Sequence, residues 1–157
     1  MLFRSQLAFS DGDLIRDLID GATYLFSNEY ESAMIEGKTG WSGEEILDRV
    51  GTQVTTLGAD GVRILARDTE PIEVKAAAGV TAVEPTGVGD AFRAGFLAGL
   101  EWELSHERAA QVGCVLAAYV VETVGTQEYS FTPEQFVGRV EGSYGEQAAA
   151  EVAAHLK

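Results

Sequence analysis

EPTGVGDAFRAGFL, residues 84–97, is the stretch that most sharply constrains the fold. A short β-rich run, Thr81–Val83, precedes it, and an apolar helix is predicted to start directly behind Asp90. Gly87 and Gly89 allow a tight turn and a close approach of the backbone to a ligand. A strand, a glycine turn and a helix in this order predict an α/β unit with a binding turn at the N-terminus of the helix.

The backbone amides of this turn form a candidate anion hole. The amides of Gly87, Val88, Gly89 and Asp90 are expected to point out of the helix end, where the helix dipole favours negative charge. Such a site suits a phosphoryl group in transit, because charge stabilisation supplies most of the catalysis. The Asp90 carboxylate is placed to accept the proton of an attacking hydroxyl. A bare Gly-x-Gly-Asp pattern favours the alternative, an N-capping Asp90 in an ordinary turn.

The longer pattern resembles the second signature of the ribokinase-like (PfkB-type) family of carbohydrate and nucleoside kinases, whose core reads D-T-x-G-A-G-D-A-F. The matching residues are Thr86, Gly87, Gly89, Asp90, Ala91, Phe92, Ala94, Gly95 and Phe96. The resemblance implies that Asp90 is the catalytic base and that Gly87, Val88 and Gly89 form the anion hole. Glu84 stands where the family usually has an Asp that helps to bind a monovalent cation, so the resemblance gives Glu84 a metal role.

Asn28-Glu29-Tyr30-Glu31 matches the N-x-x-E element of the same family and lies at a predicted strand-to-helix junction. Asn28 and Glu31 are three residues apart and therefore share a helix face. Mg²⁺ prefers carboxylate and water ligands, so Glu31 can hold a hydrated Mg²⁺ that bridges ATP phosphates. The resemblance adds Asn28 to the nucleotide and metal sites. The alternative is a capping Asn with a solvated Glu.

Two further glycine turns resemble nucleotide-binding elements of the family. TTLGADG, residues 55–61, resembles its T-L-G-x-x-G loop, which implies that Thr56, Gly58 and Gly61 contact the nucleotide. An ordinary hairpin is the alternative. Gly125 ends a long apolar helix where the family has a turn beside the adenine pocket and the cation site, and its alternative is a plain glycine C-cap.

Strands and helices alternate in the first ninety residues, which predicts an α/β sandwich with a mixed or mainly parallel sheet. The expected strands are Ala22–Phe26, Gln53–Leu57, Val62–Ala66, Ile72–Val74 and Thr81–Val83. The expected helices are one capped by Ser10, one starting at Asn28, one from a Ser42/Glu45 capping box to Val50, and then Ala91–Leu100, Ser105–Val124, Thr132–Val140 and Ser143–Leu156. We expect one domain over residues 1–157.

Composition excludes several classes of function. The chain has 157 residues, 46% of them hydrophobic, and a formal charge of −14. So acidic a surface repels phosphate backbones and anionic lipid, so we expect no nucleic-acid or membrane partner. The single cysteine, Cys114, lies in an apolar stretch and is expected to be a buried thiol rather than part of a disulfide or a zinc site. Low cysteine usage without a signal peptide predicts a cytoplasmic protein.

Within the family, the chain resembles the C-terminal half of bacterial adenosine kinases. This implies a three-layer α/β/α ribokinase-like (Rossmann-like) sandwich that lacks the N-terminal strands and the lid. It also implies ATP, a nucleoside or sugar acceptor, Mg²⁺ and a place for K⁺. The alternatives are another sugar kinase of the ribokinase or fructokinase type, or a catalytically incomplete nucleotide-binding fragment that needs a partner chain. Missing strands would expose a sheet edge, so a homo-oligomer or an N-terminal half is the expected partner.

Overall fold

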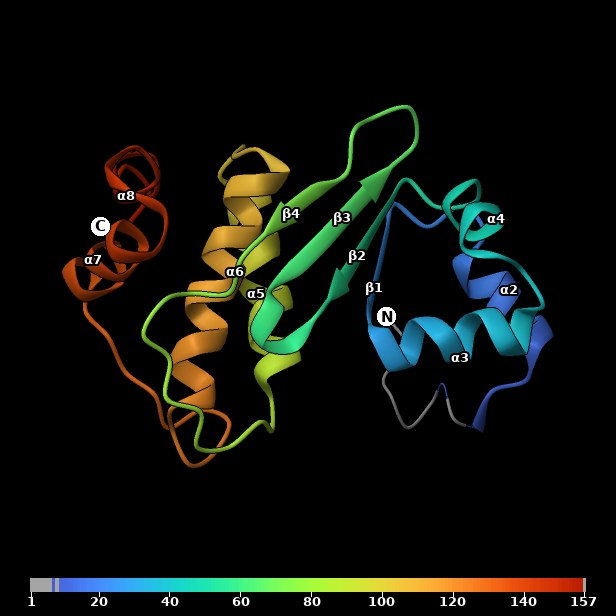
Figure 1. Cartoon of the computed structure of the whole chain (residues 1–157), viewed down its shortest axis with the longest axis horizontal. Helices are drawn as coiled ribbons and strands as arrows, with labels where there is room; N and C mark the ends of the chain where they lie inside the picture. Colours follow the sequence, from blue (N-terminus) through green and yellow to red (C-terminus); the bar gives the residue numbers. More distant parts are fainter. Residues whose placement is uncertain (1–6, 8, 157) are drawn as a thin grey trace. The chain divides into compact units, whose positions relative to one another are not determined.

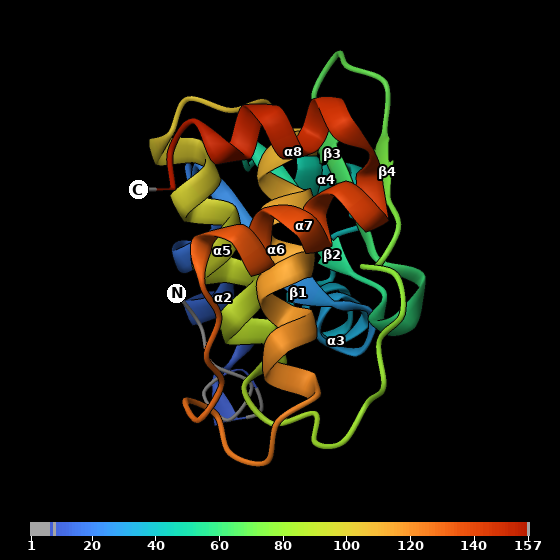
Figure 2. The same ribbon diagram turned by 90° about the vertical axis from the view of Figure 1, so that its left-hand side faces the viewer.

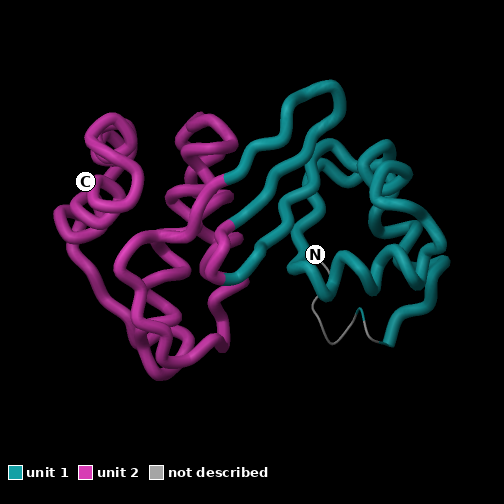
Figure 3. The backbone as a smooth tube through the Cα atoms, viewed as in Figure 1, with its two compact units in different colours: residues 1–58, 62–73 teal, residues 59–61, 74–157 magenta. Residues whose placement is uncertain are grey.

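The chain folds into two compact units in the structure, a computed structural model that describes residue 7 and residues 9–156. Unit 1 comprises residues 1–58 and 62–73, and unit 2 comprises residues 59–61 and 74–157 (Figure 3). The single domain expected from the sequence stays a prediction.

Unit 1 carries a mixed sheet, and along the chain two helices connect its first two strands (Figure 1). Its elements are α2 (Gly12–Ile19), β1 (Tyr24–Asn28), α3 (Glu29–Thr39), α4 (Gly43–Leu47), β2 (Thr52–Thr56), β3 (Val62–Ala66) and β4 (Ile72–Val74). The 3₁₀ turn η1 (Gly58–Asp60) lies between β2 and β3 along the chain, and most of it belongs to unit 2. The sheet order is β1-β2-β3-β4. β1 runs parallel to β2, and β2 runs antiparallel to β3, which confirms the mixed sheet.

The helices of unit 1 bury one face in a small apolar cluster. Its buried members are Leu7, Ile15, Ile19, Ile35, Ile46 and Val50, with Leu25 of β1 packed against them. The N-cap of α2 is Asp11 and not Ser10, because the Asp11 carboxylate accepts the Leu14 amide at 2.8 Å. The Ser42/Glu45 capping box of α4 is confirmed, although α4 ends at Leu47 rather than Val50.

Unit 2 is mainly helical, as expected (Figure 2). Its helices are α5 (Val88–Glu101), α6 (His106–Val121), α7 (Pro133–Tyr144) and α8 (Glu146–Ala153). α6 ends three residues earlier than expected, with Glu122 as its C-cap. The expected start of the last helix at Ser143 is wrong, because Ser143 belongs to α7. Gly145, with a φ of 91°, ends α7 and separates it from α8. None of the helices in the described part of the chain combines the length and apolar character that a bilayer crossing needs.

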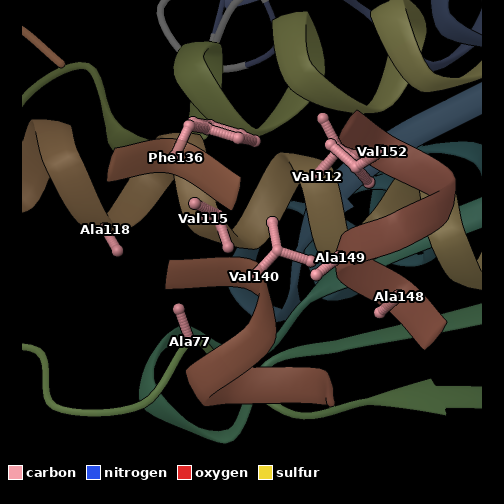
Figure 4. Close-up of a cluster of buried hydrophobic side chains, with 9 residues drawn as sticks. All are labelled: Ala77, Val112, Val115, Ala118, Phe136, Val140, Ala148, Ala149 and Val152. Carbon is pink, nitrogen blue, oxygen red and sulfur yellow. The ribbon is translucent and has the colours of Figure 1, made fainter. Parts of the chain in front are cut away.

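The core of unit 2 lies where α6, α7 and α8 meet (Figure 4). Its buried side chains are Ala77, Val112, Val115, Ala118, Phe136, Val140, Ala148, Ala149 and Val152. The buried, free thiol expected at Cys114 is confirmed. Burial raises the pKa of this thiol to about 11, although a hydrogen bond with Tyr144 opposes the shift. Cys114 is therefore protonated at neutral pH and unreactive as a nucleophile.

α5 and α6 touch through their backbones, because small residues line the contact. A Cβ at Gly95 would lie 2.8 Å from the Gly113 Cα, and one at Gly99 would lie 2.6 Å from the Ala109 Cα. A Cβ at Gly113 would likewise lie 2.7 Å from the carbonyl oxygen of Phe92. Real Cβ atoms essentially never make contacts this short, so the two helices can lie this close only because these three positions are glycine.

We expect Gly95→Ala to lower the free energy of unfolding by about 1–3 kcal/mol, because the added methyl group forces the two helices apart. Gly138→Ala in α7 is the matched control, since a Cβ there meets nothing within 4 Å. It should stabilise the protein by about 0.5–1 kcal/mol through helix propensity. Urea unfolding of both variants checks the pair, and equal effects of the same sign would contradict the packing.

Candidate active site

No side chain caps the N-terminus of α5, and Gly89 and Asp90 in its first turn are exposed. Gly87 is the N-cap and adopts a left-handed conformation with a φ of 81°. The Val88 amide donates to the Pro85 carbonyl at 3.4 Å, and the first bond of the helix is Ala91 to Gly87 at 2.9 Å. The amides of Gly89 and Asp90 lie in the first helical turn, where helix geometry supplies no partner.

The other helices show how unusual this end is. Side chains cap α2, α3, α4, α6 and α7, the capping residues being Asp11, Asn28, Ser42, Ser105 and Thr132. Of the described helices that have an assigned cap, α5 and α8 alone begin at a glycine without a side-chain cap. At α5 the free amides and the positive end of the helix dipole favour a bound anion.

Asp90 is the third residue of α5 and not its N-cap. Its side chain is 59% exposed, and its Oδ1 forms an ion pair with Arg93 Nη2 at 3.1 Å. Arg93 itself is only 19% exposed, and its Nε donates to the Gly89 carbonyl at 3.2 Å. The guanidinium therefore lies along the first turn and holds one carboxylate oxygen, while the second remains open to a hydroxyl. The sequence gives no signal for this Arg93 contact beyond the spacing of three residues.

The segment before the turn is not a strand, so the expected strand Thr81–Val83 is wrong. Instead, the backbone amides of this segment donate hydrogen bonds to the C-terminal end of α6. Those of Val83 and Glu84 both donate to the Val121 carbonyl, at 2.7 and 3.0 Å. The Thr81 amide donates to Glu122 Oε1 at 3.2 Å. Glu122 also forms a two-pronged ion pair with Arg139, which lowers the pKa of the Glu122 carboxyl.

Three of the expected site residues come together beside this segment. Glu84 Oε2 accepts the Gly125 amide at 3.0 Å. This bond, and a second from the Thr86 hydroxyl, lower the pKa of Glu84. Gly87 packs against the same turn, since a Cβ there would lie 2.9 Å from Thr126 Cγ2. Glu84, Gly87 and Gly125 are thus neighbours, and protein atoms already engage the Glu84 carboxylate.

In unit 1, Asn28 and Glu31 form a capping box at the start of α3. Asn28 Oδ1 accepts the Glu31 amide at 2.8 Å, and Glu31 Oε2 accepts the Asn28 amide at 3.0 Å. The capping alternative is thereby confirmed as the local role of both residues. Thr56 pairs with Asn28 in register across the parallel strands β1 and β2. Both residues therefore lie at the carboxyl edge of these strands, where α/β sheets commonly bind ligands.

The glycines after β2 differ in what surrounds them. A Cβ at Gly58 would meet nothing within 4 Å, so this position is open. A Cβ at Gly61 would lie 2.0 Å from the Val74 carbonyl oxygen. Gly61 is therefore needed for the close approach of the chain's own backbone, and its contact with a nucleotide stays a prediction.

Within the described part of the chain, no metal site made of protein ligands alone is found. Over residue 7 and residues 9–156, no three His, Cys, Asp or Glu side chains lie together in a group that could hold a metal ion. Glu31 nevertheless fits a hydrated Mg²⁺, because its Oε1 is not used in the capping box. Mg²⁺ usually keeps several waters and takes one or two carboxylates together with substrate phosphates.

Comparison with known proteins places the chain in a family. Residues 5–134 match the pfkB family carbohydrate kinase description. A nucleoside kinase of Methanocaldococcus jannaschii is 29% identical over 129 residues, which are 82% of this chain and 42% of that protein.

Solved structures give the same answer for the fold. The nucleoside kinase of Burkholderia thailandensis, in complex with inosine, is 34% identical with a TM-score of 0.86 over 91% of this chain and 48% of that one. The M. jannaschii nucleoside kinase, described as an archaeal member of the ribokinase family, is 28% identical with a TM-score of 0.81 over 88% and 46%. The expected α/β ribokinase-like fold is confirmed. The chain spans about half the length of these relatives.

We expect Asn28→Ala to lower the free energy of unfolding by about 1 kcal/mol, because the α3 amide of Glu31 loses its cap. Glu31→Gln is the matched variant, since a Gln side chain closes a capping box as a Glu does. It should change stability by a few tenths of a kcal/mol at most. Urea unfolding monitored by circular dichroism compares the two, and an equal loss in both would contradict a capping role confined to hydrogen bonding.

Proposed function

Because the chain belongs to the pfkB family of carbohydrate kinases, we propose that it serves ATP-dependent phosphoryl transfer to a sugar hydroxyl of a nucleoside. One observation carries the proposal. The N-terminus of α5 offers amides without a side-chain cap, and an exposed carboxylate stands in the same helical turn. This arrangement combines an anion site with a base, which is what hydroxyl phosphorylation requires.

The roles follow from the geometry of the turn. The amides of Gly87, Val88, Gly89 and Asp90 hold the transferring phosphoryl group and offset its developing charge. The open oxygen of Asp90 takes the proton as the acceptor oxygen forms its bond to phosphorus and the bond to ADP breaks. Arg93 keeps the other Asp90 oxygen in place at 3.1 Å. The side chain therefore needs little reordering before it meets the hydroxyl.

ATP is the proposed donor, and Mg²⁺ is its proposed companion. The carboxyl edge of β1 and β2 supplies Asn28, Thr56 and the open Gly58 as nucleotide contacts, and Gly61 and Gly125 are added by resemblance. When bound, Mg²⁺ would neutralise charge on the phosphates, and Glu31 Oε1 is the atom that would face its water shell. A complex named ADP-inosine of the B. thailandensis kinase, 34% identical, supports nucleotide use. The K⁺ contact expected of Glu84 stays a prediction.

A nucleoside is the proposed acceptor class. The B. thailandensis kinase was solved with inosine, and the M. jannaschii relative is also named a nucleoside kinase. Within that class, resemblance favours adenosine. Because the chain spans about half of these relatives, a second function stands beside the first. It is a nucleotide-binding fragment that transfers phosphate only with a partner chain. A cytoplasmic location stays a prediction.

Glu31→Gln should weaken ATP binding about tenfold in Mg²⁺ and leave it unchanged in EDTA, because the variant loses a carboxylate that faces the metal. Isothermal titration of wild type and variant in both buffers measures the difference. Asp20→Asn, which removes an equal charge from the exposed C-cap of α2, serves as the control. A loss of affinity of the same size in EDTA would contradict the metal role.

Asp90→Asn should lower kcat by about two orders of magnitude while ATP binding stays close to wild type, because it removes the base and keeps the anion site. The assay follows phosphorylation of adenosine, inosine, ribose and fructose with Mg²⁺ and with Na⁺ or K⁺. Unchanged kcat in the variant would refute the base. Wild-type ATP binding without transfer to any acceptor would favour the nucleotide-binding fragment.

A further inference from the structure

One side-chain contact joins the α5 turn to the turn that follows α6. Glu84 and Gly125 are 41 positions apart, and Glu84 Oε2 accepts the Gly125 amide at 3.0 Å in a partly buried position. Gly125 has a φ of 94°, a left-handed conformation that favours glycine. The Glu84 carboxylate therefore joins the segment before α5 to the turn after α6.

Two further contacts restrain the backbone around this hydrogen bond. The amides of Val83 and Glu84 share the Val121 carbonyl, at 2.7 and 3.0 Å. Gly87 lies so close to Thr126 that a Cβ would come within 2.9 Å of its methyl carbon. Along the second segment, Gly125 lies between Val121 and Thr126, the residues that make these two contacts. Loss of the Glu84–Gly125 bond would therefore loosen the chain between the two contacts and allow the α5 turn to shift relative to α6.

Electrostatics alone opposes a carboxylate at this place. Glu84 is three residues before Gly87, in a chain that already carries a formal charge of −14. A negative charge beside amides that bind an anion weakens that binding. The geometric contribution of Glu84 to an anion site and its charge therefore act in opposite directions, and this makes them separable by experiment.

We propose that Glu84 is a positioning residue that fixes the α5 turn in the shape that receives phosphate, by tying it to Gly125. The proposal deepens the proposed function and rests on it for the identity of the anion. Glu84 acts through the Gly87–Asp90 backbone and does not touch the substrate. The hydrogen bond to Gly125 favours anion binding and the negative charge of Glu84 disfavours it. The effect of the hydrogen bond is the larger of the two.

Titration calorimetry tests whether loss of the Glu84 side chain weakens or strengthens ATP binding. Glu84→Ala removes the acceptor and should weaken ATP binding about tenfold, although it also removes a negative charge. Glu84→Gln keeps the reach and one acceptor oxygen, so it should bind ATP as tightly as wild type or more tightly. Glu101→Ala removes an equal charge from the exposed end of the same helix and is the control. Equal or tighter binding by Glu84→Ala would overturn the proposal.

Amide hydrogen exchange gives a readout that does not depend on ATP. In Glu84→Ala, exchange should accelerate about tenfold at Gly125 and also at Gly87, Gly89 and Asp90, whereas Glu84→Gln should stay near wild type. Faster exchange at Gly125 alone would overturn the proposal. If the wild type does not bind ATP, the proposed function fails, and the exchange pattern still decides the role of Glu84. Should Glu84→Ala fail to fold, Glu84→Asp, which keeps the charge and loses the reach, replaces it in both measurements.

Discussion

The backbone contact between α5 and α6 is the constraint on which the candidate site of unit 2 depends. Gly95, Gly99 and Gly113 let the two helices approach within distances that no side chain would permit. Because α5 is fixed along α6, its N-terminus lies beside the C-terminal end of α6, where Val121 accepts two amides from the incoming segment. The turn at Gly87 thus rests on a rigid helix pair, which is how binding loops are commonly held.

Local patterns in the sequence were sufficient for most elements. The Ser42/Glu45 capping box, the strands β2, β3 and β4 and the four helices of unit 2 follow from spacing and caps, with errors at the helix ends. Long-range contacts were not predictable in this way. The run Thr81–Val83 has strand composition, yet the end of α6 takes its amides. The Glu84–Gly125 bond likewise joins residues that no local pattern connects.

The candidate site shows why a motif can have a structural and a functional explanation at once. Asn28 and Glu31 cap α3, and that role by itself accounts for their spacing. The capping box leaves Glu31 Oε1 unused, so the same pair that starts the helix can also face a hydrated cation at the edge of β1 and β2. At α5 the opposite holds. No side chain caps the helix at Gly87, and the amides of its first turn are therefore left for a ligand. Sequence resemblance pointed to both places, and the structure shows how their local roles differ.

If the first turn of α5 binds the phosphates of ATP, its backbone amides must respond to the nucleotide. The most direct measurement is a ¹⁵N–¹H NMR titration of the chain with ATP, with and without Mg²⁺, followed at each backbone amide. We expect saturable shifts at Gly87, Val88, Gly89 and Asp90, and much smaller shifts at Glu146 and Gln147 in α8, whose N-terminus also lacks a side-chain cap. Saturable ATP binding that leaves the four α5 amides unmoved, or that moves both helix ends equally, would contradict phosphate binding at this turn.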